Sequence, residues 1–257
     1  MRQLHSIGKK LGKHPMNLRI AILLTNDDKS AFAAEFPNDG QKVADLLEEH
    51  RPDWIFETVP VKDGVLPTSP LDFDGYVITG SPASVNDDRL VWLIPFLDFI
   101  RQIHAAKQPL IGLCFGHQAV ARALGGQVSR HAEGWGLGTA TTYWRKKSPW
   151  MQPALAATTL MAAHNEQVTQ LPDGAECLGG NDFCPIASMQ IGQHIWTTQY
   201  HPEMSLKFMQ ALLSHLRGKL DAGTLENAMV SLSQMSDATL WGRWMVQFME
   251  YARDAKK

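Results

Sequence analysis

Cysteine is scarce in this chain, which has three cysteines, Cys114, Cys177 and Cys184, among 257 residues. A small, odd number in a chain of this length excludes a disulfide framework and favours a reducing compartment. Cys177 and Cys184 lack the paired spacing of a zinc site and have no clustered histidines beside them, so we interpret them as structural residues. We expect no metal site.

The chain also lacks a charge imbalance. Its 24 lysines and arginines against 26 aspartates and glutamates give a net charge of −2. This near balance provides no basis for nucleic acid or an anionic membrane as a partner. Hydrophobic residues make up 44% of the chain and charged residues 19%, as is usual for a globular protein.

Long hydrophobic runs are missing as well. No stretch approaches the length that spans a bilayer, and residues 1–15 hold no apolar core of the kind that a signal peptide has. We therefore expect a cytoplasmic protein in which residues 1–16 form a disordered tail, or in which translation begins at Met16. The chain also has no internal repeat and no phosphate-binding loop of the form Gly-x-x-x-x-Gly-Lys-Ser/Thr.

Segments with strand and helix character alternate through the first half of the chain. Apolar runs of strand length and runs with helical spacing follow one another at 18–24, 41–50, 54–61, 75–79, 89–106 and 109–113. This alternation predicts an α/β fold with a mostly parallel central sheet and helices on both of its faces. Ligands of such sheets bind beyond the carboxyl ends of the strands.

The pattern changes in the second half. Residues 127–192 contain short segments typical of largely antiparallel strands, and residues 205–219 are compatible with a helix that packs back on the sheet. We therefore assign residues 17–219 to one domain and residues 220–257 to a helical C-terminal extension.

Methionine and tryptophan form apolar stripes over two expected helices between Leu225 and Ala252. The two helices are divided near Ser236 and Asp237, either of which can serve as the N-cap of the second. A stripe of this kind is usually core. The alternatives are a lid beside the active site and a docking face for a second subunit.

The segment Gly112-Leu113-Cys114-Phe115-Gly116-His117-Gln118 carries most of the chemical information. An apolar strand precedes it and a helix-compatible run follows, which predicts a nucleophile elbow with Cys114 at the turn. Such a turn strains the backbone of the nucleophile, and flanking glycines avoid Cβ clashes where strand and helix cross. The helix N-terminus beneath the sulfur favours the reactive thiolate. The alternative is a buried cysteine that only packs.

A second motif, Gln199-Tyr200-His201-Pro202-Glu203, follows an apolar and β-branched run with strand character. Pro202 biases His201 toward an extended conformation, in which residues two apart point to the same side. His201 and Glu203 are therefore candidates for a base and the group that orients it. With Cys114 they supply the three roles that a thiol nucleophile requires.

The two motifs together resemble those of the class I (triad) glutamine amidotransferases, over about residues 17–203. The resemblance implies that family's flavodoxin-like α/β fold and a triad of Cys114, His201 and Glu203. It extends to the GMP synthase amidotransferase domain and to cytosolic γ-glutamyl peptidases.

The segment Tyr76-Val77-Ile78-Thr79-Gly80-Ser81-Pro82 resembles the family's segment that ends in Gly-Gly-Pro or Gly-Pro. In the family, the backbone N–H before the proline helps to form the oxyanion hole, which amide hydrolysis requires because negative charge builds on oxygen. Carried over, the two donors are the N–H groups of Ser81 and Phe115. Ser81 replaces the usual glycine, which a backbone donor tolerates if its φ is negative.

The resemblance also implies substrate-binding positions. Residues 133–138, Glu-Gly-Trp-Gly-Leu-Gly, lie where the family holds the α-amino and carboxylate groups of glutamine through backbone groups. A Gly-rich hairpin is the alternative interpretation of that segment. Gln118 resembles the family's side chain that contacts glutamine. The expected substrate-binding residues are Gly80, Gln118, Gly134, Trp135 and Gly136.

A further match is Ala163-His164-Asn165-Glu166-Gln167-Val168, which resembles the family's His-x-Asp-x-Val loop near the triad. Glu166 stands where the family has Asp, and we assign the loop no electrostatic role. We expect His164 in the wall of the site rather than as a catalyst, and we assign no role to His117.

The resemblance implies hydrolysis of the γ-amide of glutamine through a γ-glutamyl thioester, with ammonia released to an unidentified acceptor. These steps need no metal, nucleotide or other cofactor, and a separate acceptor or synthase subunit is one expected partner.

Two alternatives remain open. The first is a γ-glutamyl peptidase acting on glutathione-type γ-glutamyl compounds, because residues 80–82 and 86–88 resemble the corresponding loop of those enzymes. The second is a non-catalytic regulatory or binding protein on the same scaffold, against which the intact triad argues.

Overall fold

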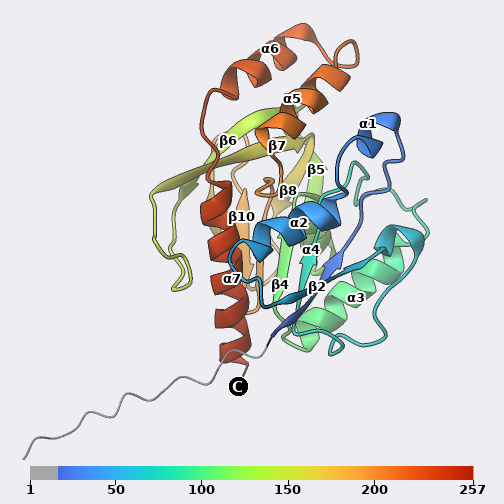
Figure 1. Ribbon diagram of the computed structural model, residues 1–257, viewed down its shortest axis with the longest axis vertical. Coiled ribbons are helices and arrows are strands. Elements are labelled where there is room, and N and C mark those ends of the chain that lie inside the picture. Colours follow the sequence, from blue (N-terminus) through green and yellow to red (C-terminus); the bar gives the residue numbers. More distant parts are fainter. Residues whose placement is uncertain (1–16, 257) are drawn as a thin grey trace, which may run out of the picture.

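The computed structural model describes residues 17–256, and the tail expected at residues 1–16 lies outside the described residues. A nine-stranded sheet forms the centre of the molecule (Figure 1). Its strands are β1 (Arg19–Leu23), β2 (Ile55–Val59), β3 (Gly75–Ile78), β4 (Leu110–Leu113), β6 (Gly136–Trp144), β7 (Ala157–His164), β9 (Ala175–Gly180), β10 (Ser188–Ile191) and β11 (Ile195–Thr198). A second, two-stranded sheet pairs β5 (Gln127–Arg130) with β8 (Glu166–Gln170).

The order of strands across the large sheet is β2-β1-β3-β4-β11-β10-β9-β6-β7. From β2 to β11 in this order the strands are parallel, and from β11 to β7 neighbouring strands are antiparallel. Every residue of β3, β4 and β11 is buried, as expected of parallel strands covered on both faces. The carboxyl ends of these three strands meet at one edge of the sheet, which brings together the segments that follow them.

Helices cover both faces of the sheet. Side chains of α2 (Asp39–Glu48) and α7 (Ala238–Ala255) join the core on one face, and those of α3 (Leu93–Ala105) and α4 (Phe115–Ala123) join it on the other. This arrangement confirms the predicted α/β fold. Helix α3 begins later than the predicted residue 89, and Pro95 lies in its first turn, where no intrahelical bond needs the missing N–H.

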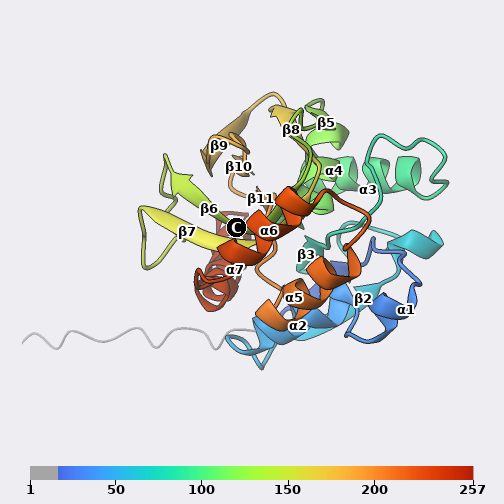
Figure 2. The same ribbon diagram turned by 90° about the horizontal axis from the view of Figure 1, so that it is seen from above.

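The remaining helices are α1 (Ala31–Ala34), α5 (Leu206–His215), α6 (Ala222–Ser231) and a short 3₁₀ turn at Val61–Asp63. Viewed from above, α5 and α6 cross the end of the sheet (Figure 2), and α6 packs on β6. Within residues 17–256, no helix combines the length and the apolar composition that crossing a membrane requires.

Helix α7 belongs to the main core. Trp241, Trp244 and Phe248 are fully buried, and the Trp241 ring stacks on Trp196 of β11 with centroids 4.8 Å apart. Of the interpretations of the Met- and Trp-rich stripe, core packing therefore applies to this helix. Asp237 occupies the N-cap position, but its carboxylate accepts a hydrogen bond from the Thr159 N–H at 2.7 Å instead of capping the helix.

The domain boundary drawn at residue 219 stays a prediction. Helix α6 lies directly beyond it and contacts both α5 and β6, and α7 shares its core with the central sheet.

Candidate active site

Cys114 lies at the turn between β4 and α4, where its motif predicts it. Its backbone has a φ of 48° and a ψ of −100°. Among the described residues other than glycine, only Lys107 also has a positive φ. This backbone region is costly for a residue with a Cβ, so the surrounding structure holds Cys114 in the strained conformation expected of a nucleophile elbow.

Close backbone contacts require the glycines on either side of Cys114. A Cβ on Gly112 would lie 2.7 Å from the carbonyl oxygen of Gly116, and a Cβ on Gly116 would lie 2.7 Å from that of Ile78. Rotation of a side chain cannot relieve a clash with backbone atoms. The crossing of β4, β3 and α4 therefore depends on both glycines.

His201 follows β11 and is held in place by two hydrogen bonds. Its backbone N–H donates to the carbonyl oxygen of Met161 at 2.9 Å. Its Nδ1 lies 2.7 Å from Oε1 of Glu203, and both side chains are buried. Because a carboxylate only accepts, Nδ1 donates. The Nε2 of His201 is buried and has no hydrogen-bond partner in the part of the chain that the structure describes.

The charges around His201 favour its protonated form. Burial alone would lower the pKa of His201, but the carboxylate of Glu203 and the sulfur of Cys114 outweigh that effect and raise the pKa well above its ordinary value. The arrangement can therefore stabilise an imidazolium beside a sulfur, which is the pair that a thiolate nucleophile needs.

Gly80, directly after β3, leaves room for the His201 ring. A Cβ at this position would lie 2.7 Å from Cε1 of His201 and 3.7 Å from the Cβ of Cys114. The expected substrate-binding role of Gly80 stays a prediction. Apart from that role, the closeness of the His201 ring leaves no room for a side chain at this position.

The expected oxyanion donors both adjoin Cys114. The φ of Ser81 lies outside the positive range, which meets the condition on its N–H, and Ser81 lines the same cavities as Cys114. Phe115 is the first residue of α4, and the first N–H groups of a helix have no intrahelical partner.

Two cavities meet at Cys114. The first, which we call the Gln118 cavity, has a volume of about 160 Å³, and its lining includes Gln118, His164 and Glu166. The second, the His201 cavity, has a volume of about 250 Å³ and extends from His201 along α5 toward α1. Ser81, Cys114 and Trp135 line both cavities, whereas Gln118 lines only the first and His201 only the second.

Gln118 is part of a network that reaches Cys114. Its Nε2 donates to the carbonyl oxygen of Glu166 at 2.7 Å and to Oε1 of Gln199 at 3.3 Å. The Nε2 of Gln199 in turn donates to Sγ of Cys114 at 3.5 Å. The amide nitrogen of Gln118 is therefore used within the protein, and its oxygen remains to accept from a ligand. The motif gave no indication of a role for Gln199, although it stands two residues before His201.

His164 lines the Gln118 cavity, and its expected place in the wall of the site stays a prediction. Its Nδ1 is 3.2 Å from the carbonyl oxygen of Glu166 and must donate, while its Nε2 is buried without a partner among the described residues. Burial lowers the pKa of His164 to about 4, so the ring is neutral near pH 7.

His117 has a structural position. Its Nε2 donates to the carbonyl oxygen of Ile186 at 3.0 Å, which leaves Nδ1 to accept from the Thr197 hydroxyl at 2.7 Å. Burial lowers the pKa of His117 to about 3. His117 lines neither cavity at Cys114, and its two hydrogen bonds join α4 to β11 and to the segment before β10.

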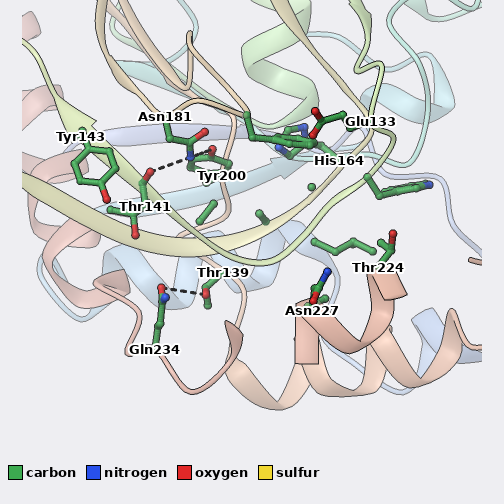
Figure 3. Close-up of a pocket in the computed structure, with 17 residues that line it drawn as sticks. Glu133, Thr139, Thr141, Tyr143, His164, Asn181, Tyr200, Thr224, Asn227 and Gln234 are labelled. Atoms are coloured by element: carbon green, nitrogen blue, oxygen red, sulfur yellow. Dashed lines mark hydrogen bonds between the residues drawn. The ribbon is translucent and has the colours of Figure 1, made fainter. Parts of the chain in front are cut away.

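A third cavity of about 500 Å³ shares Trp135 and His164 with the Gln118 cavity, but Cys114 does not line it. Thr224 and Asn227 of α6 border it on one side, and Asn181 lies across from them (Figure 3). Of the glycines expected to bind substrate, Gly136 lines this cavity. Gly134 lines none of the three. Because Cys114 is not among its walls, we assign this cavity no part in the reaction.

Comparisons with known sequences agree on one family for this chain. The sequence profile described as glutamine amidotransferase class-I matches residues 55–215, more than half of the chain. γ-Glutamyl peptidase 3 of Arabidopsis thaliana is 28% identical over 200 residues, which cover 74% of this chain and 79% of the relative. A glutamine-hydrolysing GMP synthase subunit of Halobacterium salinarum is 25% identical over 149 residues, covering 58% of this chain and 76% of the relative.

Solved structures share the fold. A glutamine amidotransferase from Thermotoga maritima has a TM-score of 0.71 at 17% identity, covering 92% of this chain and 100% of that one. A second, from Methylobacillus flagellatus, has a TM-score of 0.70 at 21% identity, covering 91% and 94%. At these identities the likeness concerns the fold alone.

Proposed function

Since the chain belongs to the class I glutamine amidotransferases, a family of amidohydrolytic enzymes, we propose that it hydrolyses the amide bond at the γ-carbonyl of a glutamyl group. Cys114 is the proposed nucleophile, His201 the base and acid, and Glu203 the group that orients the imidazole. The observation that carries this proposal is their geometry. Cys114 is strained at the elbow, Nδ1 of His201 lies 2.7 Å from Glu203, and Nε2 is left for the thiol.

The proposed reaction begins with transfer of the Cys114 proton to Nε2 of His201. The thiolate attacks the γ-carbonyl carbon, and the resulting oxyanion accepts hydrogen bonds from the N–H groups of Ser81 and Phe115. His201 then gives its proton to the leaving nitrogen as the C–N bond breaks, which leaves a γ-glutamyl thioester on Cys114. Water that passes a proton to His201 attacks the thioester, releases glutamate and restores the starting pair.

The glutamyl group is assigned to the Gln118 cavity. The free oxygen of Gln118 can accept a hydrogen bond from the substrate ammonium. The lining also contains one positive and one negative side chain, those of Arg130 and Glu166. These groups complement the zwitterionic end of an α-amino acid.

The leaving nitrogen is assigned to the side of the His201 cavity, because the proposed proton donor to that nitrogen lines this cavity. Ammonia would occupy little of its 250 Å³ or so, whereas a substituted amine would fill it. This difference supports a γ-glutamyl peptidase, and the similarity to γ-glutamyl peptidase 3 agrees with it.

Glutamine hydrolysis is the second candidate. The relative from Halobacterium salinarum is a glutamine-hydrolysing component of a GMP synthase, which favours glutamine as substrate and, as partner, a separate acceptor subunit.

The test is glutamate release by the purified chain from glutamine and from γ-glutamyl peptides, glutathione included. Cys114→Ala is the blank, and His201→Ala is expected to lose nearly all turnover because the thiol then lacks its base. Faster release from the peptides supports the peptidase, and faster release from glutamine supports the second candidate. The proposal is overturned if the folded chain releases no glutamate from either substrate, or if Cys114→Ala retains wild-type turnover.

A further inference from the structure

Apolar side chains form much of the wall of the His201 cavity. Half-buried Phe208, Leu212 and Leu216 succeed one another at four-residue spacing on α5 and at its end, so they form one stripe. Met204 continues this stripe toward His201, and Phe32 of α1 packs against Phe208 with ring centroids 5.7 Å apart.

This stripe borders the one that α5 presents to the core. Met209 and Leu213 are fully buried and cluster with Met161 of β7. Leu212 and Met204 pack against the edge of that cluster, whereas Phe208 and Leu216 belong to none of the buried clusters. A half-buried apolar stripe that faces a cavity loses further contact with water when an apolar ligand enters, which favours binding of such a ligand.

The charged groups of the lining lie at its rim or are paired. Asp28, His215 and Lys219 are exposed, and Nζ of Lys219 donates to Nε2 of His215 at 2.7 Å. Asp39 is buried, but Nζ of Lys42 lies 2.8 Å from its carboxylate. The same Nζ lies 3.7 Å from the centre of the Phe208 ring, and the side chains of the stripe are themselves uncharged.

We propose that the leaving amine of the substrate carries an apolar substituent of the size of a leucine or phenylalanine side chain, bound by Phe208 and Leu212. This inference rests on the proposed hydrolysis at Cys114 and names its substrate class as γ-glutamyl derivatives of hydrophobic amino acids. The substituent stays in the cavity until the C–N bond breaks. Each methylene that leaves water for this wall is therefore expected to raise kcat/KM by up to about fourfold.

The experiment compares kcat/KM for glutamine, γ-Glu-Gly, γ-Glu-Leu and γ-Glu-Phe. We expect γ-Glu-Leu and γ-Glu-Phe to exceed γ-Glu-Gly by about tenfold or more. Phe208→Ala and Leu212→Ala should each lower the ratio of γ-Glu-Phe to γ-Glu-Gly by about tenfold. Leu206→Ala is the matched control, since Leu206 lies on the same helix, is 44% exposed and does not line the cavity. It should leave the ratio unchanged.

Equal kcat/KM values for the three peptides, release from glutamine alone, or an unchanged ratio in both alanine variants overturns the inference. None of these results removes γ-glutamyl hydrolysis itself. Absence of release from all four substrates overturns the proposed function, so the two failures are distinguishable. Circular dichroism verifies the fold of each variant, and Leu212→Ala carries the same test if Phe208→Ala does not fold.

Discussion

Three residues that follow different strands, Gly80, Cys114 and His201, lie close together in the structure. The absent Cβ of Gly80 makes room for Cε1 of His201, and the same position faces the Cβ of Cys114. The geometry of the proposed thiol–imidazole pair therefore depends on a residue that takes no chemical part in the reaction.

Replacement of Gly80 by alanine is the sharpest test of that contact. The new Cβ, 2.7 Å from Cε1 of His201, forces the ring or the strand end to move. A displacement of this size is expected to lower kcat/KM for γ-glutamyl substrates on the order of a hundredfold. The matched control is Gly223→Ala in α6, where the nearest atom to the new Cβ lies at 3.4 Å. Wild-type kcat/KM in Gly80→Ala would show that the ring position is not constrained there.

At the scale of secondary structure elements, α7 is the element whose contribution the sequence left open. It places Trp241 among Trp144, Trp196 and Trp244, with ring centroids between 4.8 and 5.8 Å from that of Trp241. The Nε1 of Trp241 also donates to the Thr158 hydroxyl at 3.1 Å. The helix thus closes one face of the sheet whose other side carries α3 and α4.

Trp241→Ala is expected to lower the free energy of unfolding by about 3–5 kcal/mol, because it leaves a cavity in a fully packed cluster. Urea denaturation followed by circular dichroism measures the change. Met235→Ala, whose side chain is 89% exposed in the segment before α7, is the control and should stay within about 0.5 kcal/mol of wild type. A similar small effect in both variants would contradict the assignment of α7 to the core.

For the whole molecule, buried histidines couple folding to pH. Burial lowers the pKa of His117 to about 3 and that of His164 to about 4, so both are neutral in the folded chain at pH values where an unfolded chain protonates them. The stability that each contributes is present above pH 6.5 or so and is lost as the pH falls toward its folded pKa. His201 has the opposite sign. Its raised pKa adds stability below pH 6.5 or so, which is lost as the pH rises through its folded pKa.

We therefore expect acid to destabilise the protein between about pH 6.5 and pH 4, by roughly 1.4 kcal/mol per pH unit for each of His117 and His164. His194, whose pKa burial also lowers to about 4, acts in the same direction. Urea denaturation across this range measures the slope. His117→Gln should reduce it, because that variant removes one proton that only the unfolded chain binds. Trp241→Ala, which removes no titratable group, should lower stability without altering the slope. An unchanged slope in His117→Gln would contradict the account.

Much of the fold and of the proposed triad could be predicted from the chain alone, because local restrictions produce them. The strands that end before Gly80 and Cys114 are continuous apolar runs, and their residues are buried as such runs predict. The short helix α1 and the pairing of β8 with β5 were not predicted. A four-residue helix has too few residues for a periodic pattern, and the partner of a strand is not encoded next to it.

The sequence by itself determined the turn at Cys114 and the contact between His201 and Glu203, since neighbouring glycines and Pro202 restrict the backbone where these side chains stand. Only the tertiary structure decided what surrounds them. The His201 cavity takes its walls from α1, β6 and α5, and the network from Gln118 to Cys114 passes through Gln199 on another segment. The packing of segments far apart in the chain produces such contacts, and no local pattern of residues records which segments will meet.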